Sequence, residues 1–115
     1  MAQARATAKY LRTSPRKMRR VVDLVRGAHV QDARRILKFS ALGASRDVEK
    51  LLNSAVANAE AIPGVIAENL VVARAWVDEG PTFKRYRPRA YGRATRVRKR
   101  SAHVTLVVET IGDEA

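Results

Sequence analysis

The sequence predicts a small fold of the α+β class from which a long β-hairpin projects. Residues 14–62 place apolar side chains at helical spacing, whereas residues 2–11, 69–78 and 103–109 have the character of strands. The 24 residues 79–102 show no core pattern, and a structureless loop of that length is uncommon inside a compact domain. We therefore expect both flanking strands to continue past the body as the arms of a hairpin. The 115 residues suffice for one domain, with a body of about residues 1–79 and 101–110 and an arm of about residues 80–100.

Residues 2–11 alternate between polar and apolar side chains, which predicts a half-buried strand. One face of this strand would carry Ala4, Ala6, Ala8 and Tyr10, and the other would carry Gln3, Arg5, Thr7 and Lys9.

A first helix is expected to start at Ser14-Pro15, because serine is a good N-cap and proline is tolerated at the first helical position. Its apolar stripe would be Met18, Val21, Val22 and Val25, and Gly27 suits the C-terminal cap. Its first half also carries four cations, Arg16, Lys17, Arg19 and Arg20. Cations at a helix start oppose the macrodipole, so we expect them to contact phosphate, with a solvated basic face as the alternative.

Two further helices are expected in the middle of the chain. The shorter one, about residues 30–39, has the apolar positions Val30, Ala33, Ile36 and Leu37, with Phe39 as a further candidate. The longer one, about residues 44–62, keeps apolar spacing throughout and is stopped by Pro63-Gly64. Ser45 is the expected N-cap of this core helix.

Two strands are expected in the C-terminal half. In residues 69–78, one face would carry Val71, Ala73, Ala75 and Val77, and the other Leu70, Val72, Arg74 and Trp76. In residues 103–109, the side chains of Val104, Leu106 and Val108 would share a face. We interpret Trp76 as part of the core or as a cover of the sheet rather than as a platform for base stacking.

The charge of the chain is concentrated in two blocks. Its 23 Lys and Arg residues against 11 Asp and Glu residues give a net charge of +12. Residues 1–26 hold eight of the cations and residues 80–115 hold nine, while residues 27–79 are near neutral with six cations and seven acids. A near-neutral body with strongly basic segments is typical of proteins that bind nucleic acids.

The second block is densest in residues 80–100, which contain no acid. Nine of these 21 residues are basic, namely Lys84, Arg85, Arg87, Arg89, Arg93, Arg96, Arg98, Lys99 and Arg100. Burying unpaired charges is too costly for such a segment to form its own core, so it must be solvated or meet a polyanion. Aromatic residues are interleaved with the cations, and arginine planes and tyrosine rings can stack on unpaired bases. RNA or DNA is therefore the expected partner, with a disordered solvated loop as the alternative.

The sequence shows no signature of an enzyme, a metal site or a cofactor site, and we expect none of them. It has no cysteine, and its two histidines lie far apart without a paired carboxylate pattern. His29 is expected to flank a helix, and His103 to lie in a strand where it could touch phosphate. No apolar run of membrane-spanning length occurs, so no membrane span is expected.

Three blocks of the sequence carry a resemblance to a known family. They are SPRKMRRVVDLVRG at 14–27, LLNSAVANAE at 51–60 and VDEGPTFKRYRPRAYGRATRVRKRSAHVTLVV at 77–108. Together they resemble the bacterial large-subunit ribosomal protein family numbered twenty-two, with the order and spacing of the blocks kept. The run Gly80 to Ala94, of the form G-P-x-x-K-R-x-x-P-R-A-x-G-R-A, is highly specific.

The resemblance implies three helices packed on a small antiparallel sheet, with a long protruding β-hairpin. It implies a cytoplasmic, ribosome-bound structural protein that binds large-subunit rRNA through the basic residues named above, contacts neighbouring ribosomal proteins and aids subunit assembly. The hairpin would line the nascent-peptide exit tunnel and meet the nascent polypeptide with its tip, Arg89, Ala90, Tyr91, Gly92, Arg93 and Ala94. No homo-oligomer is expected. A DNA-binding architectural protein is the alternative, although no recognition helix or dimer seam stands out.

Overall fold

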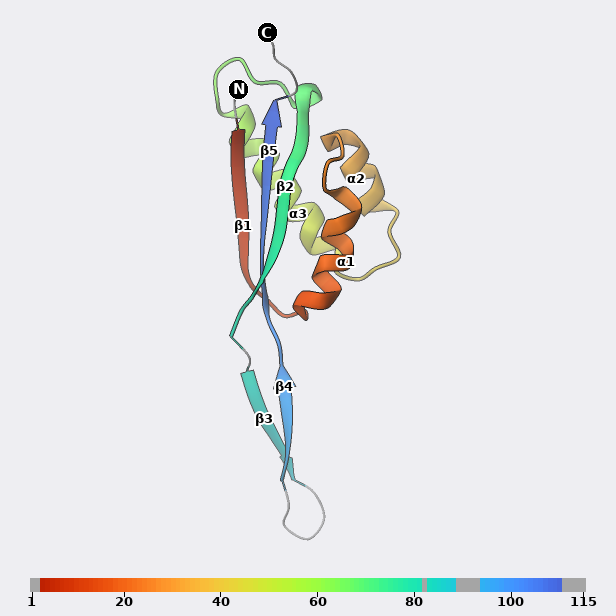
Figure 1. The fold of residues 1–115 in the computed structure, drawn as a ribbon, viewed down its shortest axis with the longest axis vertical. Helices are drawn as coiled ribbons and strands as arrows, with labels where there is room; N and C mark the ends of the chain where they lie inside the picture. The colour runs from red at the N-terminus through yellow and green to blue at the C-terminus, as the bar shows by residue number, and fades with distance from the viewer. Residues whose placement is uncertain (1–2, 82, 89–93, 111–115) are drawn as a thin grey trace.

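A computed structural model describes residues 3–81, 83–88 and 94–110, with residues 83–88 and 94–99 described by their backbone alone. It shows an α+β body with a hairpin at one end, as the sequence predicts (Figure 1). The molecule extends 70 Å along its longest axis and only 24 and 16 Å across it.

A three-stranded antiparallel sheet forms one layer of the body. Strands β1 (Gln3–Leu11) and β2 (Leu70–Glu79) both pair with β5 (Ala102–Thr110), which lies between them. In this register Leu106 of β5 is flanked by Ala6 of β1 and Ala75 of β2. The last strand in the sequence therefore joins two strands that do not pair with each other.

Three helices form the second layer and cover one face of the sheet (Figure 1). Helix α1 (Pro15–Val25) packs along β2, α3 (Ser45–Glu60) packs across β1 and β5, and α2 (Val30–Lys38) packs against α3 and α1. The core between the layers includes the fully buried side chains of Met18, Val21, Val22, Val25, Leu52, Leu70, Val72, Val104, Leu106 and Val108. The apolar stripe predicted for the first helix is confirmed, as is the shared face predicted for Val104, Leu106 and Val108 of the last strand.

Helix α1 begins and ends as the sequence predicts. The side-chain oxygen of Ser14 accepts a hydrogen bond from the backbone N–H of Lys17 (3.4 Å), and Pro15 is the first helical residue. Gly27 follows the C-cap with φ +82°, a left-handed conformation that glycine adopts without steric cost.

Helix α2 is capped by His29. Its Nδ1 accepts a hydrogen bond from the backbone N–H of Gln31 (3.2 Å), so Nε2 carries the proton and donates to the carbonyl of Glu68. The prediction that Ile36 and Phe39 belong to the apolar face was wrong, since their side chains are 37% and 77% exposed. The helix ends at Lys38, and Phe39 is only its C-cap, outside the buried stripe.

Helix α3 does not use the predicted serine cap. Its N-cap is Ala44, which makes no side-chain hydrogen bond, and Ser45 is already the first helical residue. The hydroxyl of Ser45 is buried and has no hydrogen-bond partner among the described residues. The helix starts one residue too early for this hydroxyl to cap it, so the predicted cap was wrong.

The alternation of β1 breaks near its end. Tyr10 was predicted to share the face of Ala8, but its side chain is 60% exposed and its φ is +60°. The register with β5 shifts between Ala8 and Leu11, so Leu11 takes the half-buried position instead.

A bulge also interrupts β2 between Val72 and Arg74. Leu70 and Val72 are buried before the bulge, and Ala75 and Val77 are buried after it. The single alternation predicted for residues 69–78 was therefore wrong in its first half, because one extra residue in a bulge moves the following side chains to the other face.

The hairpin forms a second sheet beyond the body. Strands β3 (Phe83–Pro88) and β4 (Ala94–Lys99) pair antiparallel and lie beyond the ends of β2 and β5 (Figure 1). The expected hairpin is confirmed for these two strands.

Candidate nucleic-acid interface

The first half of α1 presents the predicted cluster of cations to solvent. Arg16, Lys17, Arg19 and Arg20 are all exposed, because Pro15, Met18 and Val21 take the buried positions of the same turns. No acid lies in the first turn. An anion can therefore bind the exposed face of this turn without competing with a carboxylate from the turn itself.

Arg19, one member of this cluster, also makes a hydrogen bond within the body. The guanidinium of Arg19 donates a hydrogen bond to the carbonyl of Val77 (3.1 Å) at the outer edge of β2. Arg26 was not predicted as a functional residue, yet its guanidinium donates two hydrogen bonds to the carbonyl of Ala75 (2.8 and 3.1 Å) and pairs with Asp23 (2.7 Å). Both arginines satisfy carbonyls of an edge strand, which would otherwise be open to another chain.

The hairpin register distributes the basic positions over both faces of the two-stranded sheet. Lys84 lies opposite Arg98, and Tyr86 lies opposite Arg96. On the alternate positions, Arg85 lies opposite Val97 and Phe83 lies opposite Lys99. Because successive residues of a strand belong to opposite faces, each face of the hairpin holds three basic positions: Lys84, Arg96 and Arg98 on one, Arg85, Arg87 and Lys99 on the other.

Such a hairpin has no apolar face to pack against a body. Two-stranded hairpins are marginally stable alone, and like charges directly opposite each other destabilise a strand pair further. A polyanion on both sides would supply the missing counter-charge.

The base of the hairpin is fixed to the body by hydrogen bonds. The backbone N–H of Gly80 donates to the carbonyl of Ser101 (3.1 Å), and the hydroxyl of Ser101 donates to the carbonyl of Pro81 (2.6 Å). Ser101 is buried, although the adjacent Arg100 is exposed. These contacts bind together the two segments that lead from the body into the hairpin.

His103 contacts the body next to this base. Its Nδ1 accepts a hydrogen bond from the backbone N–H of Tyr10 (3.1 Å), and the two rings meet edge to face with centroids 4.9 Å apart. The irregular end of β1 is thereby anchored to β5. The contact with phosphate expected for His103 stays a prediction.

The other predicted contacts are described only in part. Arg89, Ala90, Tyr91, Gly92 and Arg93 lie outside the described residues, and Ala94 is the first residue of β4. Within the described part of the chain, His, Asp and Glu side chains do not gather in threes as a metal site would require. No helix in that part is long and apolar enough to cross a membrane.

Comparisons of the sequence with a family model and with individual known proteins identify the same protein family. The model of the family described as ribosomal protein L22p/L17e matches residues 6–109. The chain is 56% identical over 108 residues to the large ribosomal subunit protein uL22 of Desulfitobacterium hafniense (strain DSM 10664 / DCB-2), covering 94% of this chain and 95% of that protein. It is 55% identical over 106 residues to the protein of the same name from Halothermothrix orenii, covering 92% and 94% of the two chains.

Proposed function

Because the chain belongs to the ribosomal protein L22p/L17e family, we propose that it is a structural constituent of the large ribosomal subunit. It works on the ribosome in the cytoplasm, where it binds large-subunit rRNA and packs beside neighbouring ribosomal proteins. It is a structural protein and not an enzyme. Its mechanism is neutralisation of phosphate charge, which lets separate rRNA segments approach one another as the subunit assembles.

The observation that carries this proposal is the placement of basic positions on both faces of the β3–β4 hairpin. A protein that lies on the surface of a nucleic acid needs cations on one side only. Cations on both sides suit a strand pair that is surrounded by RNA. The hairpin is also narrow enough to enter a gap between RNA segments, since it is only two strands wide, or about 5 Å between strand axes.

We assign the rRNA contacts to the two basic segments. They are Arg16, Lys17, Arg19 and Arg20 of α1, and Lys84, Arg85, Arg87, Arg89, Arg93, Arg96, Arg98, Lys99 and Arg100 of the hairpin arm. Arg19 has a second role, since one of its N–H groups holds the edge of β2. Residues 1–79 and 101–110 form the body that folds as a unit, and residues 80–100 form the arm.

The arm lines the nascent-peptide exit tunnel in this proposal. Its tip, Arg89, Ala90, Tyr91, Gly92, Arg93 and Ala94, is the part that meets the nascent polypeptide. Membership of the family supports this placement, as does the position of β3 and β4 beyond the ends of β2 and β5, away from the helices.

A sedimentation experiment tests the proposal. A tagged form of the chain is expressed in bacterial cells, and the lysate is separated on a sucrose gradient in magnesium buffer after a high-salt wash. We expect stoichiometric co-migration with the large subunit. Migration with the nucleoid DNA, or recovery only in the light fractions, would contradict the proposal.

Two variants sharpen this experiment. Removal of residues 84–98 should abolish retention in the high-salt wash, because it deletes seven of the nine basic residues of the arm. The control is Arg46→Gln with Lys50→Gln, which removes two exposed cations from α3 and should leave retention unchanged.

A further inference from the structure

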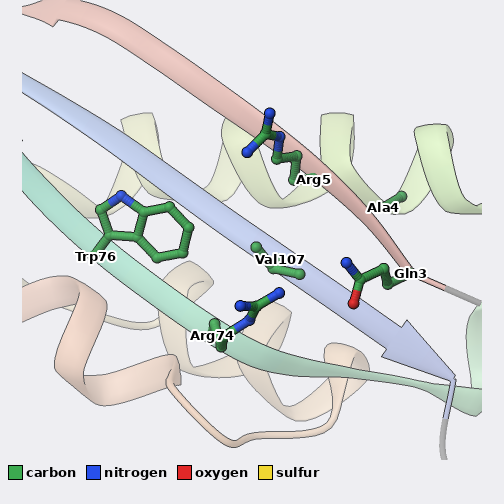
Figure 2. Close-up of a pocket in the computed structure, with 6 residues that line it drawn as sticks. All are labelled: Gln3, Ala4, Arg5, Arg74, Trp76 and Val107. Atoms are coloured by element: carbon green, nitrogen blue, oxygen red, sulfur yellow. The ribbon is translucent and has the colours of Figure 1, made fainter.

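The outer face of the three-stranded sheet is left uncovered by the helices. Figure 2 shows the side chains of Arg5, Trp76 and Val107 in front of the sheet, with the helices behind it. Together with Gln3, Ala4 and Arg74 they border an open hollow of about 260 Å³. The bulge in β2 brings Arg74 and Trp76 to this face, since it moves Ala75 and Val77 into the core.

Two arginines flank the hollow from opposite strands. Arg5 of β1 and Arg74 of β2 are both register partners of Val107, so their backbones lie about 10 Å apart across the central strand. Both arginine side chains are exposed, yet Val107 between them is only 2% exposed. The side chains around it therefore shield this valine, and long arginine stems can do so while their charged heads stay in solvent.

The two arginines of this face, Arg5 and Arg74, have no ion-pair partner in the part of the chain that the structure describes. Glu109 belongs to the same face of β5, two residues beyond Val107, but no ion pair joins it to either arginine. The two guanidinium groups are thus available to an anion that approaches from outside.

We propose that this face binds one unpaired nucleotide of RNA, with the base against the indole of Trp76 and the phosphate between Arg5 and Arg74. This inference rests on the proposed function and adds a contact that the two basic segments do not supply. Trp76 is half-buried, so part of its ring covers the sheet while the rest is open to solvent. Bases stack on aromatic rings that a sheet presents in this way, and arginine binds phosphate through paired N–H groups.

The size and charge of the face favour RNA over a protein partner. A stable protein interface buries roughly 800 Å² on each side, whereas this hollow is small, and the two arginines that flank it supply positive charge for a phosphate. The hollow lies just below the size range of small-molecule pockets, roughly 300 Å³ and above, which suits partial insertion of one flat group.

Intrinsic fluorescence tests the stack directly, because Trp76 is the only tryptophan of the chain. The full chain is titrated with an oligouridylate single strand, with an RNA duplex and with polyphosphate, which carries charge but no base. We expect strong quenching by the single strand and little quenching by the other two. Equal quenching by polyphosphate or by the duplex, or none by the single strand, would overturn the proposal.

Charge variants show whether the quenching arises at this face. Arg5→Gln with Arg74→Gln should weaken it, whereas Arg46→Gln with Lys50→Gln, which removes the same charge from the exposed side of α3, should not. Equal weakening by both pairs would mean that the oligonucleotide senses only net charge, and the site would be refuted.

Binding to naked large-subunit rRNA separates the base contact from the phosphate contact. Trp76→Leu should weaken binding about tenfold with an unchanged salt slope, and Trp76→Phe should restore most of the affinity. Arg74→Gln should instead lower the log–log salt slope by about 0.7. Circular dichroism melts confirm that each variant is folded.

Two outcomes distinguish failure of this inference from failure of the proposed function. If Trp76→Leu binds naked rRNA as tightly as the wild type but no longer enters subunits, the face docks on a protein and the nucleotide site is wrong. If the wild-type chain neither binds the rRNA nor sediments with the subunit, the ribosomal function itself is wrong.

Discussion

Replacing Gly80 by alanine tests whether the base of the arm is locked to the body. A Cβ atom at this position would lie 2.5 Å from the hydroxyl oxygen of Ser101 and 3.1 Å from Cε1 of His103. Because favourable contacts between heavy atoms begin at about 3.5 Å, the hydroxyl has to move by about 1 Å. That movement breaks its hydrogen bond to the carbonyl of Pro81 (2.6 Å).

The expected cost follows from the burial of this hydroxyl. Ser101 is only 1% exposed, so the displaced group cannot reach water. Leaving a buried polar group without a partner costs about 1–3 kcal/mol, and we expect Gly80→Ala to lower the free energy of unfolding by that amount. For a domain of this size the melting temperature should fall by roughly 4–12 °C.

Thermal and urea unfolding followed by circular dichroism provide the assay. Gly43→Ala is the matched control, because its Cβ would meet no atom within 4 Å, and we expect a change within about 0.5 kcal/mol. In a double-mutant cycle, Ser101→Ala should recover part of the loss, since it removes the clashing oxygen. If Gly80→Ala were as stable as the wild type, or if the effects of Gly80→Ala and Ser101→Ala were strictly additive, the argument that the base of the arm is fixed to the body at Ser101 would be refuted.

Three further predictions concern the body. Removal of residues 84–98 should leave a cooperative unfolding transition, because the core lies outside the arm; a broad, non-cooperative melt would contradict the division into body and arm. Arg26→Ala should lower the free energy of unfolding by about 1–3 kcal/mol, since the carbonyl of Ala75 loses two hydrogen bonds; urea unfolding measures this, and an unchanged midpoint would speak against it. Ser45→Ala should be neutral or raise stability by up to about 1 kcal/mol, because the hydroxyl has no partner among the described residues; a loss above 1 kcal/mol would reveal one.

The elements that sequence reasoning predicts well have local signals. The start of α1 needs only Ser14 and Pro15, which are neighbours, and its end needs only the left-handed conformation of Gly27. The inner face of β5 follows from a short run rich in β-branched and apolar residues, in which Val104, Leu106 and Val108 share a face. The signals for these features lie in neighbouring residues, so the sequence alone suffices to place them.

The errors arise where a strand depends on its partner. The irregular end of β1 at Tyr10 and the bulge of β2 between Val72 and Arg74 are properties of strand pairing with β5, and no residue pattern within either strand marks them. A single extra residue then reverses the assignment of faces. Trp76 was predicted to belong to the core or to cover the sheet, and its half-buried ring covers the outer face of the sheet beyond the bulge.

The candidate site likewise contains residues that the sequence alone reveals and residues that only the fold brings together. The basic residues of α1 and the arm stand out by charge density, which is visible in any sequence. The contact of Arg26 joins residues 49 positions apart and leaves no trace in spacing or composition. The hollow beside Trp76 likewise combines three strands from both ends of the chain, so only the fold brings its residues together.

The central place of β5 has a consequence for how the protein is made. β1 and β2 each pair with β5 and not with each other, and β5 consists of residues 102–110. During synthesis β1 emerges first but has no partner until about a hundred residues later, so its pairing is highly non-local. The three helices can form earlier, because the hydrogen bonds within each helix are local. The sheet can close only once residues 102–110 have emerged, which delays completion of the core until nearly all of this sequence has been translated.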